Sequence, residues 1–352
     1  MKMEGDKCTD GTLIRSNGVQ EELLWGINWK KVAWKNVIIL LYMHVATIYS
    51  LLFTKYTGSL VILEFLFFYI GAVGVTGGAH RLWSHRSYKA KWQLRLLLAV
   101  FQITAFQSHI YDWVLQHRVH HKFSETNADP HNANRGIFFS HIGWFLIRKH
   151  PDVKKKGNTL DFSDLRNDPI VMWQRKYYLV LVPLLTFIIP TWLPMYLLGV
   201  DFWTSWNAGI VRLTAIFNFT SLVNSVAHRW GYKPYDKAIR PVENPIVAFL
   251  SLGEGWHNFH HAFPYDYRTA ELGIHVFNPT TAFLDFFGKL GWAYDFKMVT
   301  DETIKKRKKR SGNPSLDHHK MFCVWGWGDK DMKECEYEDV TIKHGSVNIG
   351  LQ

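Results

Sequence analysis

Four long apolar segments organise this sequence. They cover residues 36–54, 60–78, 178–199 and 207–226, with short connections between the first and second and between the third and fourth. Each is close to the roughly 20 apolar residues that a helix needs to cross the hydrocarbon core of a bilayer. The pattern therefore predicts an all-α integral membrane protein with four transmembrane helices.

The remaining sequence is more polar. Two apolar stretches, residues 94–106 and 246–252, are too short to span and are expected to form interfacial or buried helices on the cytosolic face. We divide the chain into an N-terminal segment (1–35), a main domain (36–299) and a polar tail (300–352), and expect the tail to be loosely ordered. The N-terminal segment lacks an apolar core followed by a cleavage site, so no cleaved signal peptide is expected.

Lysine and arginine are distributed unevenly around the four segments. The two short connections contain only Lys55, whereas the other flanks carry Lys30, Lys31, Lys35, Arg81, Arg86, Arg175, Lys176, Arg229 and Lys233. By the positive-inside rule, both termini and the long middle segment face the cytosol. Glu64 and Arg212 lie near segment ends, so we expect their charged groups to snorkel to the interface.

The net charge of +11 comes partly from one basic run, residues 305–310. On a membrane protein we expect such a run beside anionic headgroups. No zinc-finger spacing or RNA-binding aromatic motif indicates a nucleic-acid partner. Three scattered cysteines, Cys8, Cys323 and Cys335, argue against a disulfide framework and fit a reducing cytosol.

Nine of the 18 histidines form short clusters near the apolar segments. They are His80, His85, His117, His120, His121, His228, His257, His260 and His261. Residues four apart lie on one face of a helix, so His117 with His121, and His257 with His261, can each reach one ion. All fall on the predicted cytosolic side, and Asn224, one turn before His228, is a further candidate. We expect His44, His141 and His275 to be hydrogen-bonded structural residues instead.

Nine histidines suggest two metal ions with four or five ligands each. Imidazole suits zinc, copper, iron and nickel alike, so the donors leave the metal open. The His-Glu-x-x-His motif of zinc hydrolases is absent. An all-imidazole site must be tuned by the groups around it, and Glu125, Asp129 and Glu254 are placed for that role.

With these residues in hand, the sequence resembles the membrane fatty acyl-CoA desaturases, which include stearoyl-CoA desaturases, and in particular the insect acyl-CoA desaturases. The likeness covers about residues 29–297. Its most specific parts are the three histidine boxes, the Asn224-Ser-Val-Ala-His228 segment, Ala-Asp129-Pro-His131-Asn and Arg148-Lys149-His150-Pro.

The resemblance implies four membrane helices below a cytosolic helical cap in the endoplasmic reticulum membrane, with two Fe²⁺ ions beside a kinked tunnel for a long-chain acyl-CoA. In relatives, one iron is held by the residues matching His80, His85, His117, His121 and His260. The other is held by those matching His120, His228, His257 and His261, with Asn224 acting through water. Electrons come from cytochrome b5 and its NADH-dependent reductase, and this sequence contains no His-Pro-Gly-Gly haem motif of its own.

The chemistry that this resemblance implies fits a metal centre. An unactivated methylene C–H offers no acidic proton, so acid–base catalysis cannot start the reaction and O2 must be reduced at iron. The protein then contributes ligation, positioning and exclusion of water. The bend of the tunnel decides which carbons meet the iron.

The sequence departs from its relatives at the expected headgroup site. Leu115 and Gln116 stand where relatives usually carry Arg-Asp, Ser108 matches an Asn that contacts the headgroup, and Ser221 matches a Trp. Arg148 and Lys149 remain to bind phosphate. The tetrapeptide of residues 240–243 ends in Glu, which in insect relatives is associated with Δ9 rather than Δ11 enzymes.

Several readings stay open at this point. The leading one is a desaturase that introduces a first double bond, with Δ9 favoured over Δ11. A shifted acyl chain would instead give another regiochemistry, a hydroxylase or a conjugase. The altered headgroup residues also fit a non-catalytic lipid- or partner-binding relative, and the histidines alone fit a membrane zinc-binding protein.

Overall fold

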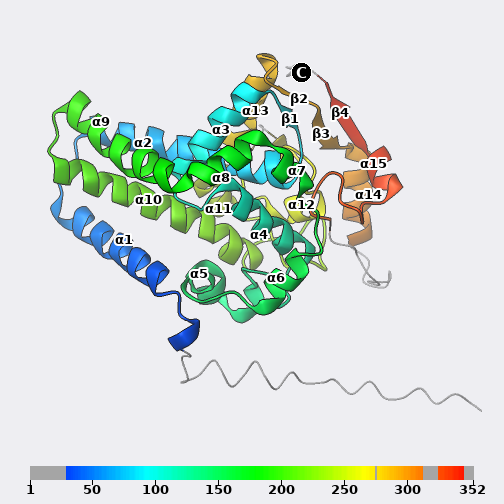
Figure 1. Cartoon of the computed structure of the whole chain (residues 1–352). Helices are drawn as coiled ribbons and strands as arrows, with labels where there is room; N and C mark the ends of the chain where they lie inside the picture. The colour runs from blue at the N-terminus through cyan, green and yellow to red at the C-terminus, as the bar shows by residue number, and fades with distance from the viewer. Residues whose placement is uncertain (1–28, 274–275, 312–323, 345–352) are drawn as a thin grey trace, which may run out of the picture.

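The computed structural model describes residues 29–273, 276–311 and 324–344. These residues contain four helices that are long and apolar enough to cross a membrane: Trp34–Phe53, Gly58–Ser84, Pro169–Leu198 and Phe202–His228. Figure 1 shows the spans side by side at one end of the molecule and the shorter elements gathered at the other. We call the part outside the spans the cap. The predicted fold class, a four-span helical membrane protein with a helical cap, is confirmed.

Three of the spans join more than one type of helix. The first span is α1 (Trp34–Phe53), and the second is α2 (Gly58–Val73) with the π-helix η2 (Gly74–Ser84). The third span is α8 (Pro169–Val182) with η5 (Pro183–Ile188) and α9 (Ile189–Leu198). The fourth span is α10 (Phe202–Ser225) with η6 (Val226–His228). The third span begins at Pro169, earlier than the predicted residue 178. Asp168 caps α8 there by accepting the backbone N–H of Ile170 at 2.9 Å. Its first turns include Gln174, Arg175 and Lys176 and lie against the cap, where Gln174 donates to the carbonyl of Ala99 at 3.0 Å.

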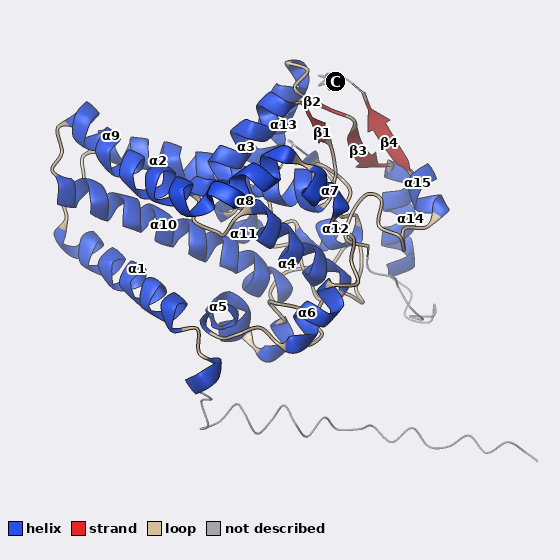
Figure 2. Cartoon of the chain, in the orientation of Figure 1, coloured by secondary structure: helices blue, strands red, loops and turns tan. Residues whose placement is uncertain are grey.

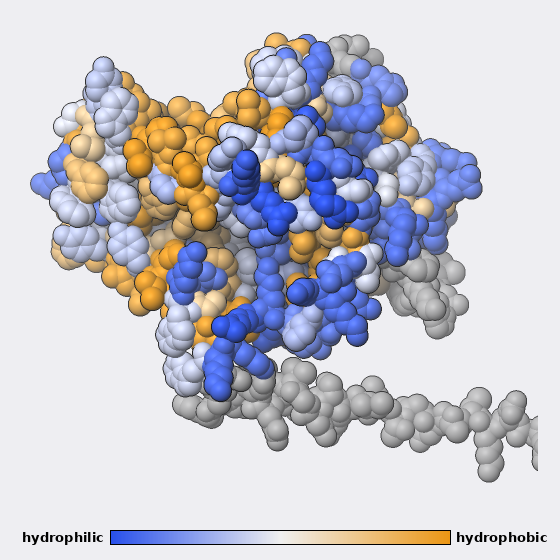
Figure 3. Space-filling model, viewed as in Figure 1, coloured by the Kyte–Doolittle hydropathy of each residue, from blue (hydrophilic) through white to orange (hydrophobic). Residues whose placement is uncertain are grey.

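The outward faces of the spans are apolar. Only 17% of the apolar part of α1 is buried within the protein, and Ile38, Leu41 and Leu52 are 64%, 62% and 69% exposed. Figure 3 shows hydrophobic residues over the spans and hydrophilic ones over most of the cap. A helix that exposes so much apolar surface needs a lipid solvent, as expected for a membrane protein.

The second span packs closely against α3 (Trp92–Thr104), one of the two short apolar stretches. At Gly74 a Cβ atom would lie 2.2 Å from the backbone nitrogen of Gln102, so only glycine allows this approach. The whole of η2 is buried, and π-helical turns of this kind often occur at functional sites. The other stretch forms α11 (Pro245–Leu250), so both were correctly predicted to be short helices.

The rest of the cap consists of short helices and two small sheets. The helices are α4 (Ile110–Lys122), α5 (Trp144–Leu146), α6 (Pro151–Gly157), α7 (Ser163–Asn167), α12 (His257–Ala262), α13 (Pro279–Lys289), α14 (Asp301–Ser311), α15 (Glu334–Glu338), η1 (Trp29–Lys31), η3 (Ala133–Arg135) and η4 (Phe139–Gly143). The strands β1 (Lys89–Ala90) and β2 (Ala293–Tyr294) pair antiparallel, as do β3 (Phe296–Val299) and β4 (Val340–Lys343). Figure 2 shows these strands on one side of the cap, away from the spans.

One expectation for the C-terminal tail is wrong for the residues described. Instead of being loosely ordered, residues 301–311 form α14, and residues 324–344 include α15 and β4. The basic run lies on α14, where Arg307 pairs with Asp236 and Lys308 with Glu271, each at 2.6 Å. Figure 1 shows α14 at the end of the cap opposite the spans, and its expected place beside anionic headgroups stays a prediction. The division of the chain at residues 35 and 299 stays a prediction.

Glu64 and Arg212 do not snorkel to an interface, contrary to the sequence-based expectation. Both are buried, and Arg212 Nε donates to Glu64 Oε2 at 2.9 Å. The same guanidinium donates to the carbonyl oxygens of Thr104 and Thr186, each at 3.3 Å. Because a lone charge is costly away from water, the two residues neutralise each other and join α2 to α10.

This pairing predicts a non-additive effect on stability. Glu64→Leu and Arg212→Met should each lower the thermal unfolding temperature of the detergent-solubilised protein, because each leaves one buried charge unpaired at a cost of about 3–5 kcal/mol. The double variant should be more stable than either single variant. If the decreases in unfolding temperature of the two single variants simply add in the double variant, the cost of an unpaired buried charge is not the dominant effect.

Candidate metal centre

The first of two histidine clusters gathers side chains from three parts of the fold. His80 lies in η2, His85 follows it, His117 and His121 lie one turn apart on α4, and His260 lies on α12. One ring nitrogen from each of the five lies within 4.8 Å of the others. The Nε2 atoms of His80 and His260 are 3.0 Å apart, and those of His85 and His117 are 2.8 Å apart.

The second cluster lies beside the first and shares its two later helices. It consists of His120 on α4, His228 at the end of η6, and His257 and His261 on α12, again within 4.8 Å of one another. His257 Nε2 lies 3.0 Å from His228 Nε2 and 3.1 Å from His261 Nε2. Each of α4 and α12 thus supplies histidines to both clusters.

Six of these imidazoles are held neutral. Burial, reinforced by repulsion among neighbouring rings, holds the pKa well below its usual value for His85, His117, His121, His257, His260 and His261. For His120, burial disfavours protonation, but the Asp129 carboxylate outweighs it and raises the pKa. Neutral imidazoles keep a lone pair available for a metal ion.

Partners on the outer side fix the direction of four rings. His120 Nδ1 donates to Asp129 at 2.8 Å, His228 Nδ1 to Glu125 at 2.9 Å, and His85 Nδ1 to the backbone carbonyl of Trp325 at 2.5 Å. His80 Nδ1 forms an ion-pair contact with Glu254 at 2.9 Å. With the proton on Nδ1, each ring directs the lone pair of Nε2 inward.

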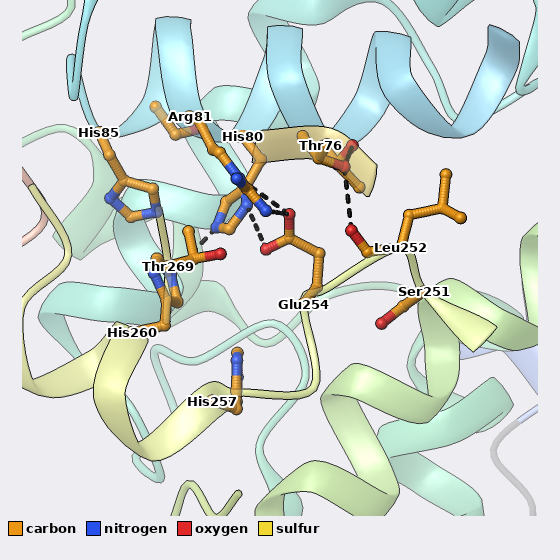
Figure 4. Close-up of polar contacts among 12 residues, drawn as sticks. Thr76, His80, Arg81, His85, Ser251, Leu252, Glu254, His257, His260 and Thr269 are labelled. Carbon is orange, nitrogen blue, oxygen red and sulfur yellow. Dashed lines mark hydrogen bonds and ion pairs between the residues drawn. The ribbon is translucent and has the colours of Figure 1, made fainter. Parts of the chain in front are cut away.

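Glu254 links His80 to the surrounding scaffold. Figure 4 shows its carboxylate between His80 and Arg81, with His257 and His260 nearby on α12. Arg81 is completely buried and donates to Glu254 Oε1 from Nε at 3.1 Å and from Nη2 at 2.8 Å. The predicted contacts of Glu125, Asp129 and Glu254 with the histidines are therefore confirmed.

The donor arrangement fits a pair of transition-metal ions. Several ring nitrogens direct their lone pairs at one another inside the clusters. Two acceptor lone pairs cannot form a hydrogen bond with each other. His120 Nε2 is buried and has no hydrogen-bond partner among the described residues. Imidazole nitrogens in groups of five and four suit iron, zinc, copper or nickel, and a cation at each group would satisfy the converging lone pairs.

A cavity of about 450 Å³ connects the two clusters with the spans. His80 and His117 of the first cluster line it, as do His120 and His257 of the second. Its walls continue along the spans with apolar residues, including Met43, Ala72, Leu213 and Ile216, and its lining also includes Lys35 and Lys149. A mainly apolar ligand that also carries an anionic group matches this lining.

The loop between α3 and α4 shapes the cavity wall near the histidines. Gln107 donates to Thr220 at 2.8 Å and accepts from the indole N–H of Trp113 at 3.3 Å, and all three residues line the cavity. Phe106 and Ser108 on either side have positive φ angles of 57° and 66°. The loop and α10 are therefore held at a defined separation where the cavity passes the metal clusters.

The structure brings all nine predicted histidines together, in the two sets that the resemblance implied. Their role as metal ligands stays a prediction, as does that of Asn224, which lines the cavity from α10. His44 contacts Leu40 and Asn218, and His141 contacts Ser225 and Asn218, as expected for structural histidines. His275 lies outside the described residues.

The predicted substrate residues divide into two groups. Ser108, Gln116, Lys149 and Ser221 line the cavity. Arg148 instead borders a second, smaller pocket that Lys149 also lines, and Leu115 packs against the hydrophobic core. Burial lowers the pKa of Lys149 to about 8, so a phosphate nearby would favour its charged form.

Sequence reasoning missed three contributors to the site. Arg81 was read as a flanking charge, yet it is buried against Glu254. His131 forms a third compact group with His120 and Asp129, and burial lowers its pKa to about 3. Trp325 contributes a backbone carbonyl, which leaves no trace in a side-chain pattern.

Comparison with known proteins identifies the family. The model of the fatty acid desaturase family matches residues 57–278. The chain belongs to the fatty acid desaturase family. It is therefore an enzyme, an oxidoreductase of a di-iron family, and the resemblance to insect desaturases is confirmed.

Three insect relatives show how close the similarity is. The chain is 52% identical over 317 residues to "Acyl-CoA Delta-9 desaturase" of Acheta domesticus, covering 89% of this chain and 87% of the relative. It is 51% identical over 315 residues to "Acyl-CoA Delta12-desaturase" of the same species, covering 89% and 86%. It is 46% identical over 304 residues to "Acyl-CoA Delta(11) desaturase" of Trichoplusia ni, covering 86% of each chain.

Glu243, the last residue of the tetrapeptide, has a definite structural position. It is buried, and its Oε1 accepts the backbone N–H of Phe259 on α12 at 2.7 Å. Its side chain thus supports the helix that carries His257, His260 and His261. A glutamine would retain an acceptor oxygen at this place, so Glu243→Gln can keep the hydrogen bond to Phe259.

Glu243 predicts a pH effect with a defined sign. Burial raises its pKa from 4.5 to about 8, so the folded state keeps a proton that the unfolded state loses between these values. Its contribution to stability therefore declines as pH rises toward 8. The unfolding temperature of the wild type minus that of Glu243→Gln should decrease from pH 6 to pH 9.

Glu243→Ala serves as the comparison for the same experiment. It removes the acceptor at every pH and should cost about 1 kcal/mol of stability. A difference between wild type and Glu243→Gln that does not change with pH would contradict the buried, protonated carboxyl group.

Proposed function

We propose that this protein is an acyl-CoA desaturase of the endoplasmic reticulum membrane. It inserts a double bond into a saturated long-chain fatty acyl-CoA, with two Fe²⁺ ions, O2 and electrons delivered by cytochrome b5 and its NADH-dependent reductase. The observation that carries the proposal is the convergence of two histidine clusters on one apolar cavity with lysines in its lining. The desaturase relatives support the acyl-CoA substrate.

The side chains have distinct roles in this proposal. His80, His85, His117, His121 and His260 hold one iron, and His120, His228, His257 and His261 hold the other, with Asn224 acting through water. Bound iron would supply the activation of O2 that removal of hydrogen from an unactivated methylene requires. Glu254, Asp129 and Glu125 keep the Nδ1 protons of His80, His120 and His228 in place.

The cavity positions the acyl chain and excludes water from it. Lys149 and Arg148 bind the phosphates of the CoA headgroup, and Ser108, Gln116 and Ser221 contact the substrate where it enters. The Gln107–Thr220 hydrogen bond holds the walls at the level of the clusters, so that one pair of carbons meets the metal centre. Leu115 lies behind this wall and acts through packing.

We favour the Δ9 position, with Δ11 as the alternative. The glutamate at position 243 and the Δ9 relative support Δ9. The Δ12 relative is almost equally similar, at 51% identity, so an unusual regiochemistry is the second candidate. We further propose that both termini and the cap face the cytosol, since the flanking lysines and arginines are concentrated on that side of the spans.

Expression in a desaturase-deficient yeast tests the activity directly. Fatty acids are extracted, and double bonds are located by mass spectrometry after derivatisation. A new Δ9 monoene is the expected product, and a Δ11 or Δ12 product would support desaturation while overturning the position. With stable protein in the membrane and an active control desaturase, absence of any product would favour a non-catalytic relative.

Replacing one histidine tests the metal assignment. His120→Ala should abolish the product and lower the iron content of anaerobically prepared protein from about two ions per chain to about one, because four nitrogens then become three. His344→Ala, which changes a histidine 76% exposed and paired with Asp295, is the matched control and should remain active. Full activity of His120→Ala would rule out the assignment, and stoichiometric zinc in place of iron would favour a zinc-binding protein.

A further inference from the structure

A C-terminal segment, residues 324–332, contacts the first histidine cluster directly. Trp325 accepts the Nδ1 proton of His85 with its backbone carbonyl at 2.5 Å. Two residues later, the backbone N–H of Trp327 donates to the carbonyl oxygen of His85 at 2.9 Å. The segment therefore binds both the ring and the main chain of a residue some 240 positions earlier in the sequence.

The approach of the two chains requires glycine at position 326. Gly326 has a φ angle of 156°, and a Cβ atom there would lie 2.6 Å from both the Cα and the carbonyl oxygen of His85. Both atoms belong to the backbone, so they cannot rotate away. Any side chain at this position would push the segment off His85.

Charged groups hold the segment in place. The Trp325 indole lies over the guanidinium of Arg118 at 4.1 Å, and Asp329 accepts from Lys122 Nζ at 2.8 Å and 2.9 Å and from the Trp325 backbone N–H at 2.9 Å. Arg118 and Lys122 lie on α4, the helix that carries His117 and His121. The segment is thus attached to the same helix as two of the five histidines of the cluster.

The carbonyl has a chemical consequence for His85. It can only accept a hydrogen bond, so it fixes the proton on Nδ1 and leaves the lone pair of Nε2 directed at the cluster. In the second cluster, Asp129 and Glu125 fix His120 and His228 in the same way. The two clusters therefore have separate outer supports, and one of them comes from the C-terminal segment.

We infer that residues 324–332 are a built-in part of the first metal site, with the Trp325 carbonyl acting as the positioning group for His85. The inference rests on the proposed function, in which the five-histidine cluster holds an iron ion. It predicts selective damage: displacing the segment loosens the first ion and leaves the second bound.

Gly326→Ala displaces the segment by adding one methyl group. Gly136→Ala is the matched control, because Gly136 also has a positive φ, 99°, but has nothing within 4 Å of a Cβ. Each full-length protein is purified anaerobically and loaded with Fe²⁺. Iron per chain is measured by mass spectrometry, and iron release to a colorimetric chelator is followed over time.

Wild type and Gly136→Ala should hold two ions per chain. Gly326→Ala should release one of its two ions about 10- to 100-fold faster, the usual effect of losing a group that orients a metal-binding histidine. Two ions released at the wild-type rate would overturn the inference. A wild type that binds no iron would overturn the proposed function instead, so the two failures are distinguishable.

Milder variants cover the case in which Gly326→Ala does not fold. Asp329→Asn weakens the attachment to Lys122, and Trp325→Leu removes the ring from Arg118 while retaining the carbonyl. Both should accelerate release of one ion and leave the release of the other unchanged. Equal acceleration of both ions would indicate general destabilisation and would contradict the inference.

Discussion

A buried ion pair between Arg81 and Glu254 joins the membrane half of the molecule to the cap. Arg81 belongs to η2 at the end of the second span, and Glu254 precedes α12. The same guanidinium also donates to Asn278 at 3.2 Å and Thr281 at 2.8 Å, next to and within the first turn of α13. Neither charge is stable in this environment without the other.

The histidine clusters depend on that junction. Once Arg81 and Glu254 meet, His80 is brought to α12 and its outer nitrogen reaches Glu254 at 2.9 Å. The nine rings then converge from separate elements into a buried region, where their lone pairs are matched by a cation more readily than by each other. A polar network of this size, enclosed in apolar surroundings, specifies a single arrangement of spans and cap.

The sequence predicted those parts of the protein that are encoded by local patterns of neighbouring residues. Uninterrupted apolar runs identified the spans, and one-turn spacing paired His117 with His121. It failed where a residue's partner is distant: the charge of Arg212 looked suited to an interface until Glu64, 148 positions away, was found beside it. The order of the tail was missed because β4 pairs with β3 through its backbone, which requires little hydrophobicity.

Regiochemistry is set at a finer level than the fold. Relatives named for Δ9 and Δ12 products are 52% and 51% identical to this chain, so a common scaffold serves both outcomes. One carbon–carbon bond along an extended chain is a displacement of little more than 1 Å, far smaller than the spacing between side chains on a helix. Such a shift requires only small changes in the residues that line the cavity, including those near Gln107.

The contact between Trp325 and His85 also orders events in biosynthesis. His85 leaves the ribosome long before residue 325 has been translated, so it lacks this support while the four spans, the last of which ends at His228, are being translated. At about 5–20 residues per second, the delay amounts to tens of seconds. The support for His85 thus becomes available only near the end of translation, so a prematurely terminated chain could insert correctly in the membrane and still lack it.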